Sequence, residues 1–221
     1  MIFDKYDKNS FKSQYEQDKV LLYFIGDKKN GFFIELGALD GLIISNSYFF
    51  EKELGWNGVL IEPIPESYKN LKKNRKCYTS NALISYENGL ELDFLMAGAG
   101  SGIIDDDNPQ SSGYYVRENI KNPRIKMKTK TLDNVLDEFN SPKNIDFLSL
   151  DVEGHEYDVM KNFPFEKYFI NYIVVENNSS IDNNSNMDNF KDLMKSKNYK
   201  KLNLPDFMLN KTCDDFYMLE N

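Results

Sequence analysis

Short apolar segments alternate with amphipathic or polar segments along most of the chain. Buried strands are expected where apolar, β-branched or aromatic residues form short runs, at residues 31–36, 58–62, 76–80, 145–151 and 169–176. Helices are expected between them, at residues 45–54, 65–74, 132–139, 156–162 and 187–197. This alternation favours βαβ units around a parallel sheet, and therefore an α/β fold.

The remaining segments complete this prediction. Further strands are expected at 90–96 and 124–129 and near residues 199 and 216–219, while residues 1–30 form an N-terminal helical segment. Gly, Ser, Asp, Asn and Pro dominate the segment that begins at residue 97, so we expect a mobile loop over 97–124. The polar run 177–189 is expected to be a surface loop. A length of 221 residues suits a single domain over 1–221, complete or cut from a longer protein.

Charge and composition exclude several partners. The formal net charge of −8 lacks the basic surface that binds phosphate backbones, so we expect no nucleic acid or anionic membrane as partner. No apolar run approaches the roughly 20 residues that cross a bilayer. Cys77 and Cys213 lie too far apart for a metal or redox motif, and we interpret both as core residues of a cytoplasmic protein.

Acidic residues stand at the ends of the central predicted strands. Glu35 and Glu62 close the first two strands, and Asp151 and Glu176 close two later ones. In doubly wound sheets, ligands bind at the carboxyl edge of the strands. The four carboxylates are therefore expected around one cleft.

The segment Glu35-Leu-Gly37-Ala-Leu-Asp40-Gly41 is the first candidate binding motif. Glycines after a strand allow a sharp turn and a close approach to a ligand. A dinucleotide site has the pattern G-x-G-x-x-G, whereas here an acid precedes the first glycine. An acid is unfavourable beside a pyrophosphate but suits the cationic amino group of S-adenosylmethionine. The simpler alternative is a strand and a tight turn without a ligand.

Glu62 is the second candidate. A carboxylate at the end of the second strand can accept hydrogen bonds from both ribose hydroxyls of an adenosine. The alternative is a solvated acid at a strand end.

Together, these and other segments resemble the FkbM family of methyltransferases along nearly the whole chain. The matching stretches are Ser13-Gln-Tyr-Glu-Gln-Asp18, Gly31-Phe-Phe-Ile-Glu-Leu-Gly-Ala-Leu-Asp-Gly41, Ser45-Asn-Ser47, Glu53-Leu-Gly-Trp-Asn-Gly58, Leu60-Ile-Glu-Pro63, Thr131-Leu-Asp133 and Ile145-Asp-Phe-Leu-Ser-Leu-Asp-Val-Glu-Gly154. The resemblance implies a Rossmann-like class I methyltransferase fold, with a mostly parallel seven-stranded sheet and helices on both faces. It also implies S-adenosylmethionine as methyl donor and a hydroxyl acceptor, most often on a sugar of a glycan or nucleotide sugar.

The resemblance also assigns cofactor contacts by position. The residues expected around the methionine end are Glu35, Gly37, Ala38, Asp40, Gly41 and Asn46. Those expected at the ribose, beside the adenine and over the cofactor are Glu62 with Pro63, Asn81 with Ala82, and Gln17 with Asp18. The chain departs from the family at Glu16, where glycine is usual, and at Leu39, where asparagine or a small residue is usual.

Asp151, Glu153 and His155 are the candidate catalytic residues. Asp151 suits a general base or a ligand of Mg²⁺ or Mn²⁺, and a bound metal would acidify a hydroxyl that an ordinary carboxylate deprotonates poorly. Glu176 and Asn177 would complete that metal site, an arrangement similar to metal-dependent catechol-type and macrolide-sugar O-methyltransferases. Otherwise Asp151 orients the substrate alone and Glu176 is structural.

Three alternatives remain open. His155 is either a base that titrates near neutral pH or a surface residue at a helix start. The run Asp105-Asp-Asp107 is either a second acidic site or a solvated loop. For the whole chain, the other hypotheses are a nucleotide-dependent oxidoreductase and a non-catalytic cofactor- or glycan-binding module of a multidomain glycan enzyme.

Overall fold

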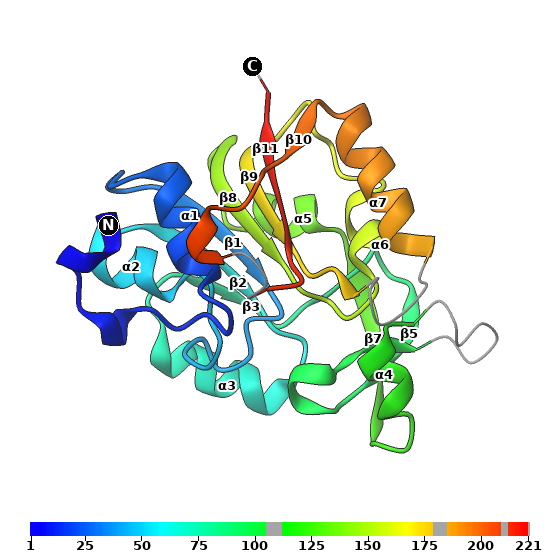
Figure 1. Ribbon diagram of the computed structural model, residues 1–221. Coiled ribbons are helices and arrows are strands. Elements are labelled where there is room, and N and C mark those ends of the chain that lie inside the picture. The colour runs from blue at the N-terminus through cyan, green and yellow to red at the C-terminus, as the bar shows by residue number, and fades with distance from the viewer. Residues whose placement is uncertain (105–111, 179–184, 209–211, 221) are drawn as a thin grey trace.

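The computed structural model describes residues 1–104, 112–178, 185–208 and 212–220, and its central feature is a large mixed sheet (Figure 1). In these ranges seven strands pair in the order β10-β11-β9-β8-β1-β2-β3. Their bounds are Phe32–Leu36 (β1), Asn57–Ile61 (β2), Tyr78–Ser80 (β3), Asn144–Leu150 (β8), Phe169–Val175 (β9), Tyr199–Lys201 (β10) and Asp215–Leu219 (β11). All neighbours from β9 to β3 are parallel, and only β11 runs antiparallel to both of its neighbours. The predicted α/β fold with a mostly parallel sheet is therefore confirmed.

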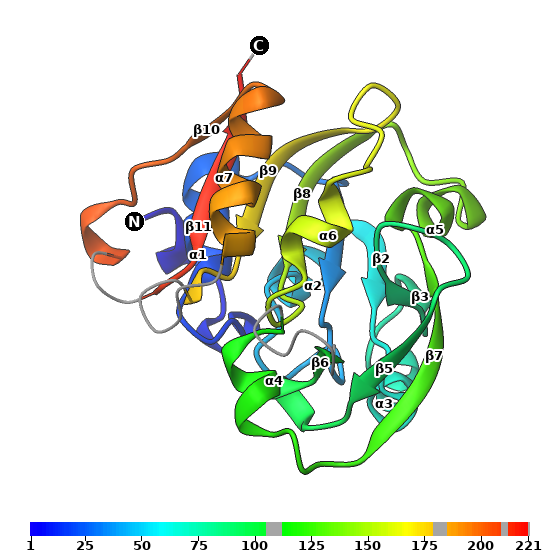
Figure 2. The same ribbon diagram turned by 90° about the vertical axis from the view of Figure 1, so that its right-hand side faces the viewer.

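Helices cover both faces of this sheet (Figures 1 and 2). Helices α1 (Gln17–Ile25), α2 (Tyr48–Leu54) and α3 (Pro65–Asn74) pack on one face. Helices α5 (Leu132–Glu138), α6 (Glu156–Met160) and α7 (Ser185–Ser196) pack on the other. The molecule therefore has three layers, with the sheet between two layers of helices.

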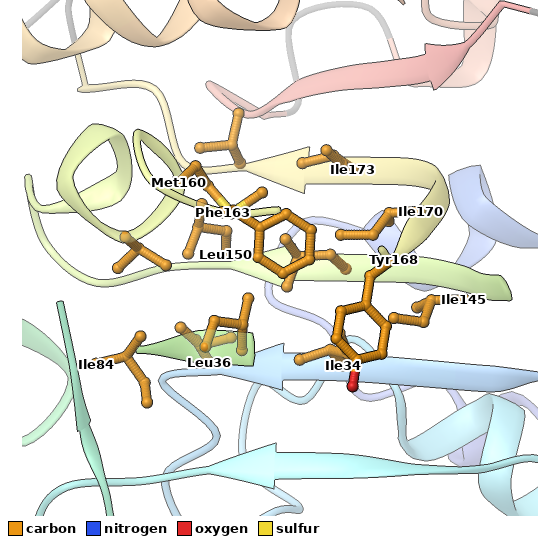
Figure 3. Close-up of a cluster of buried hydrophobic side chains, with 14 of the residues drawn as sticks. Ile34, Leu36, Ile84, Ile145, Leu150, Met160, Phe163, Tyr168, Ile170 and Ile173 are labelled. Carbon is orange, nitrogen blue, oxygen red and sulfur yellow. The ribbon is translucent and has the colours of Figure 1, made fainter. Parts of the chain in front are cut away.

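The two apolar layers follow from the alternation of side chains along each strand. In β1, Ile34 and Leu36 face the core under α5, α6 and α7, while Phe33 faces the core under α1 and α2. Figure 3 shows the first of these cores, where Ile145 of β8 lies beside Ile34 of β1, and Ile173 lies on β9, beyond β8. Burying one such side chain contributes about 1.5–3 kcal/mol, so the central strands are held from both faces.

The helix expected at 45–54 begins only at Tyr48. The preceding residues are not helical because Ser45, Asn46 and Ser47 turn inward and bind the carboxylate of Glu35. The pattern of apolar residues predicted the helix but not this turn.

A second, smaller sheet lies beyond the carboxyl edge of the large one (Figure 2). Its order is β4-β7-β5-β6, with bounds Leu83–Ile84 (β4), Glu91–Leu95 (β5), Gly102–Ile104 (β6) and Arg124–Lys130 (β7). The short helices η3 (Gly98–Gly100) and α4 (Tyr114–Glu118) connect its strands. The prediction of a loop over 97–124 is therefore wrong where these strands and helices form. Residues 105–111, with the candidate acidic run Asp105–Asp107, lie outside the described residues.

The glycine content of this segment explains the error. Glycine is rare in strands, but a Cβ at Gly102 would lie 2.5 Å from Val116 and 3.1 Å from the Glu153 side chain. Glycine is required at this position by close packing, and not because the backbone is a free loop.

The remaining helical elements belong to the two ends of the chain. The N-terminal segment contains η1 (Ile2–Lys5) and η2 (Lys8–Ser10) before α1, and η6 (Asp206–Met208) precedes β11. The loop expected at 177–189 ends early, since α7 begins at Ser185, and residues 179–184 lie outside the described ranges. In the described part of the chain, no helix has the length and apolarity needed to cross a membrane.

The carboxyl ends of β1 and β8 meet at one glycine. Gly37 follows β1 with a φ of +75°, and a Cβ there would lie 2.3 Å from the carbonyl oxygen of Asp151. This distance is far inside van der Waals contact, so only glycine lets the two strand ends approach in this way.

Gly37→Ala is therefore expected to lower the free energy of unfolding by about 3 kcal/mol or more. Gly89→Ala is the matched control, because Gly89 has a φ of +80° but no heavy atom within 4 Å of its added Cβ. Alanine at that position should cost only the left-handed backbone strain of about 1–2 kcal/mol. Urea denaturation of both variants measures the difference, and equal losses would show that the contact with Asp151 is not a constraint.

Candidate active site

A cavity of about 780 Å³ lies between the two sheets, at the carboxyl edge of the large one. This volume is in the range of pockets that hold small-molecule ligands. Its walls come from the loop after β1, the ends of β2, β8 and β9, the N-terminal segment, the second sheet and α4. The expected convergence of strand-end acids on one cleft is confirmed for Glu62, Asp151 and Glu176.

The structure brings about half of the predicted site residues to the cavity. Those that line it are Gly37, Glu62, Pro63, Ala82, Asp151, Glu153, His155 and Glu176. Those that do not line it are Gln17, Asp18, Glu35, Ala38, Asp40, Gly41, Asn46, Asn81 and Asn177. Most of the second group build the loops that carry the first.

Glu35 organises the loop between β1 and α2 instead of standing on the cavity wall as predicted. Its buried carboxylate accepts hydrogen bonds from the Ser45 hydroxyl at 3.0 Å, from the Asn46 amide at 2.8 Å and from both the amide and hydroxyl of Ser47. The buried guanidinium of Arg75 donates to the same two hydroxyls, at 3.1 and 3.0 Å. These donors satisfy the carboxylate within its own loop, and the Glu35 side chain does not line the cavity.

Asn46 carries an acceptor without a partner. Its side-chain amide donates to the Ser149 hydroxyl at 2.9 Å. Its Oδ1 is buried and has no hydrogen-bond partner among the described residues. Burying an acceptor without a hydrogen bond costs free energy unless a ligand supplies a donor.

Asp40 and Gly41 shape the turn that follows Gly37. The Asp40 carboxylate accepts hydrogen bonds from the amides of Leu42 at 2.9 Å and Ile43 at 2.8 Å. A Cβ at Gly41 would lie 2.5 Å from the Leu71 side chain, so helix α3 packs directly on this turn. Asp40 and Gly41 therefore shape this loop, and the cofactor contacts predicted for them and for Ala38 stay predictions.

Glu62 lies on the cavity wall and also ties two loops together. Its Oε2 accepts the amide of Leu39 and its Oε1 the amide of Ile64, both at 2.8 Å. Burial raises the pKa of this carboxyl to about 7, against the lowering effect of the two amides. Leu39 has a φ of +47°, in the left-handed region that asparagine adopts at lower cost. An asparagine at this position would adopt the same conformation at lower cost than leucine.

Of the two residues predicted to lie beside the adenine, one lines the cavity and the other is structural. Ala82 lines the cavity beside Leu83 and Ile84. Asn81 does not line it, because its amide donates to the carbonyls of Glu62 at 2.7 Å and Pro63 at 2.9 Å. Asn81 therefore holds the strand ends together.

The N-terminal segment reaches the cavity through residues that sequence reasoning missed. Gln14 and Tyr15 line the cavity, although the prediction named Gln17 and Asp18. Gln17 donates to Asp214 at 2.5 Å, and Asp18 accepts the amides of Lys12 and Ser13 at 2.8 and 3.1 Å.

The other missed wall comes from the second sheet and α4. It includes Phe94, Ile103, Tyr115 and the small residues 98–101. The only sequence signal for this wall was the glycine-rich run itself, which resembles an ordinary loop.

Three carboxylates gather at the other end of the cavity. One oxygen each of Asp151, Glu153 and Glu176 lies within 4.8 Å of the others. At that distance two ionised carboxylates repel by roughly 3 kcal/mol at an effective dielectric constant of about 20. Burial, followed by this repulsion, raises the pKa of Asp151 well above its ordinary value and that of Glu153 to about 9. Burial and the charge of Glu156 raise the pKa of Glu176 to about 7.

Glu153 is held in place by the loop around it. It has a left-handed φ of +56°, and its carbonyl accepts the Gly113 amide at 3.0 Å. Asn177, predicted as a metal ligand with Asp151 and Glu176, instead donates its amide to Asp215 at 3.0 Å. Glu153 takes the place in the cluster that was expected for Asn177.

His155 lines the cavity but is not an ordinary base. Its Nε2 lies 2.9 Å from the Ser85 hydroxyl and its Nδ1 3.5 Å from the Asp158 carboxylate. Burial lowers its pKa to about 4, so the imidazole is neutral at pH 7. His155 stands at the start of α6, as one alternative expected, but with 15% of its side chain exposed it is half-buried instead of a surface residue. The lowered pKa does not support titration near neutral pH.

Comparisons with known proteins agree with this architecture. The sequence profile of the family described as "Methyltransferase FkbM domain" matches residues 35–201. The FkbM methyltransferase from Methylobacillus flagellatus aligns over 87% of this chain with 10% identity and a TM-score of 0.51, although the chain spans only 44% of that protein. No curated protein sequence matches the chain.

Two further solved structures share the fold. An O-methyltransferase from Bacillus cereus, in complex with SAH, has 12% identity and a TM-score of 0.51, with 94% of this chain and 82% of that one covered. A Klebsiella pneumoniae protein described as an O-methyltransferase has 9% identity and a TM-score of 0.53, with 100% and 90% covered. At these identities the likeness establishes a Rossmann-like methyltransferase fold for the chain.

The acid cluster predicts a pH-dependent stability. The pKa of Glu153 is about 9 in the folded state, which is above its value in the unfolded chain. The free energy of unfolding is therefore highest at low pH and decreases as the pH rises toward 9. In buffer with EDTA, Glu153→Gln should therefore be nearly as stable as wild type at pH 5, and more stable than wild type at pH 8 by about 4 kcal/mol. Urea denaturation at both pH values measures this.

The control is Glu91→Gln, on an exposed residue at the start of β5. It should change stability equally at both pH values. If Glu153→Gln behaved in the same way, Glu153 would not be a strained buried acid.

Proposed function

Because the chain belongs to the FkbM methyltransferase family, we propose that it transfers a methyl group from S-adenosylmethionine to a hydroxyl oxygen. The observation that carries this proposal is the single cavity that joins Gly37, Glu62 and the acid cluster. One end of the cavity has the groups that suit the donor, and the other end has the groups that can handle a hydroxyl proton.

The donor end offers partners for each part of the cofactor. Gly37 on the cavity wall lets the methionine end approach the backbone of the loop after β1 closely, because it has no Cβ. Each oxygen of Glu62 already accepts one amide and keeps capacity for a second donor, as a ribose hydroxyl would supply. The apolar surface of Ala82, Leu83 and Ile84 suits an adenine ring. The Bacillus cereus structure contains SAH, the product of this donor, in the same fold.

The reaction needs little more than alignment and proton removal. The bond from the methyl carbon to sulfur breaks with its electron pair left on sulfur, a bond to the acceptor oxygen forms, and the hydroxyl proton passes to a base. Asp151 is placed for that task, since it lines the cavity at the end of β8 and its raised pKa makes its ionised form a stronger base than an ordinary carboxylate. Glu153 and Glu176 surround the same position.

We infer a sugar as the acceptor from the family resemblance and from the chemistry of the wall. Tyr15, Tyr115, Asn119 and Asn178 line the cavity. Aromatic faces pack against the apolar faces of sugar rings, while amides and carboxylates bind hydroxyls. A hydroxyl of a glycan or of a nucleotide sugar suits such a wall.

Calorimetric titration with S-adenosylhomocysteine tests the donor. Wild type is expected to bind it with micromolar affinity and to bind NADH not at all. Glu62→Gln should weaken the binding about 10- to 100-fold, because a hydrogen bond to a charged group is worth roughly 1.5–3 kcal/mol. Glu91→Gln should leave it unchanged. Tight NADH binding without S-adenosylhomocysteine binding would move the oxidoreductase hypothesis ahead.

Asp151→Asn tests the base. This variant should bind S-adenosylhomocysteine within a few-fold of wild type and lose at least 100-fold in transfer rate. Transfer of tritium from methyl-labelled S-adenosylmethionine to a panel of nucleotide sugars and methyl glycosides measures the rate. Unchanged transfer on an acceptor that wild type methylates would remove Asp151 from the mechanism, and an unmethylated panel with intact cofactor binding would favour a binding module.

A further inference from the structure

Five acids lie near one another around the end of β8, and three of them have protein donors. Glu156 accepts the amides of Val152 at 3.3 Å and Gly154 at 3.1 Å through its Oε1. Asp214 accepts the side-chain amide of Gln17 at 2.5 Å. Glu176 also accepts a hydrogen bond from the Asn178 side chain. The fold therefore provides donors for three of the five acids, while Asp151, Glu153 and Glu176 still lie within 4.8 Å of one another.

Glu153 has an oxygen that nothing in the fold explains. Its side chain is 7% exposed, and its Oε2 is buried without a hydrogen-bond partner in the described ranges. It lines the cavity together with Asp151 and Glu176. No lysine or arginine of the described residues forms an ion pair with any of the three. A buried acid in this setting requires a cation or a proton.

The geometry suits a cation. The three oxygens lie within 4.8 Å of one another, and an ion at the centre of a triangle of that size is about 2.8 Å from each corner. Oxygen ligands bind Ca²⁺ at about 2.3–2.6 Å and Mg²⁺ at about 2.0–2.1 Å. An inward shift of a few tenths of an ångström for each carboxylate is therefore sufficient. His155 points to Ser85, so the donor set consists of oxygen alone and favours a hard ion.

We propose that Asp151, Glu153 and Glu176 bind one hard divalent cation, Mg²⁺ or Mn²⁺, in the cavity. The site draws on the end of β8, the turn after it and the end of β9, and only its open side faces the cavity. Its role rests on the proposed function: a bound divalent ion lowers the pKa of a hydroxyl that it coordinates. The protein ligands leave coordination positions open on the side where the acceptor would enter.

The acids have one competing explanation within the same cavity. Their negative charge could serve the sulfonium and ammonium of the methyl donor directly, without a metal. In that case substitution of Glu153 would weaken cofactor binding, and the protein would bind no metal in the absence of cofactor.

Electron paramagnetic resonance of Mn²⁺ with the full chain separates these explanations, because bound Mn²⁺ loses the sharp signal of the free ion. Wild type is expected to bind one Mn²⁺ per chain at micromolar concentration, without cofactor, and Mg²⁺ should compete for the site. Glu153→Gln and Glu176→Gln should each weaken Mn²⁺ binding at least 10-fold. Glu91→Gln is the matched control and should bind Mn²⁺ as wild type does.

S-adenosylhomocysteine titration of the same samples keeps the two proposals distinguishable. Intact S-adenosylhomocysteine binding without Mn²⁺ binding, in either the free or the complexed protein, would overturn the cation site and leave the methyltransferase proposal standing. Mn²⁺ binding that is unchanged in both Glu153→Gln and Glu176→Gln would place the ion elsewhere and overturn the assignment. Mn²⁺ binding without S-adenosylhomocysteine binding would support the cation site and contradict the proposed donor.

Discussion

The close contact between Gly37 and the backbone of Asp151 is the constraint on which the rest of the site depends. It brings the end of β1 against the end of β8, with 2.3 Å between a virtual Cβ and the Asp151 carbonyl oxygen. The loop after β1 therefore starts directly beside the acid cluster. A side chain at residue 37 would separate the two, and the loop after β1 would no longer adjoin the acid cluster.

The acids at the strand ends have different environments, and this difference separates their tasks. Glu35 is surrounded by amide and hydroxyl donors, with Arg75 behind them, so it shapes a loop. Glu62 has one amide on each oxygen and still faces the cavity. Glu153 has an oxygen without any donor. The same residue type is thus enclosed in a loop, exposed to the cavity or left without a donor, according to the number of donors that the fold places around it.

The second sheet changes the character of the cavity. The carboxyl edge of the large sheet carries the loop after β1 and the acids at the strand ends. The strands β4 to β7 and helix α4 add a wall of apolar and aromatic groups opposite that edge, including Phe94, Ile103 and Tyr115. Gly113 and Gly154 pack against each other where this wall meets the Glu153 turn, so the wall and the acid cluster are built as one unit.

The sequence alone determined the α/β architecture, because alternation of apolar runs with amphipathic segments depends only on residues near one another in the chain. It also determined the family and the convergence of Glu62, Asp151 and Glu176, because the ends of parallel strands share one edge. Only the tertiary structure decided that Glu153 joins the cluster, that Asn177 turns to Asp215, and that Glu35 is enclosed by its own loop. The second sheet was also hidden in a glycine-rich run. In each of these cases the outcome depends on donors and packing partners that are distant in the chain, such as Arg75 for the loop around Glu35 and Val116 for Gly102.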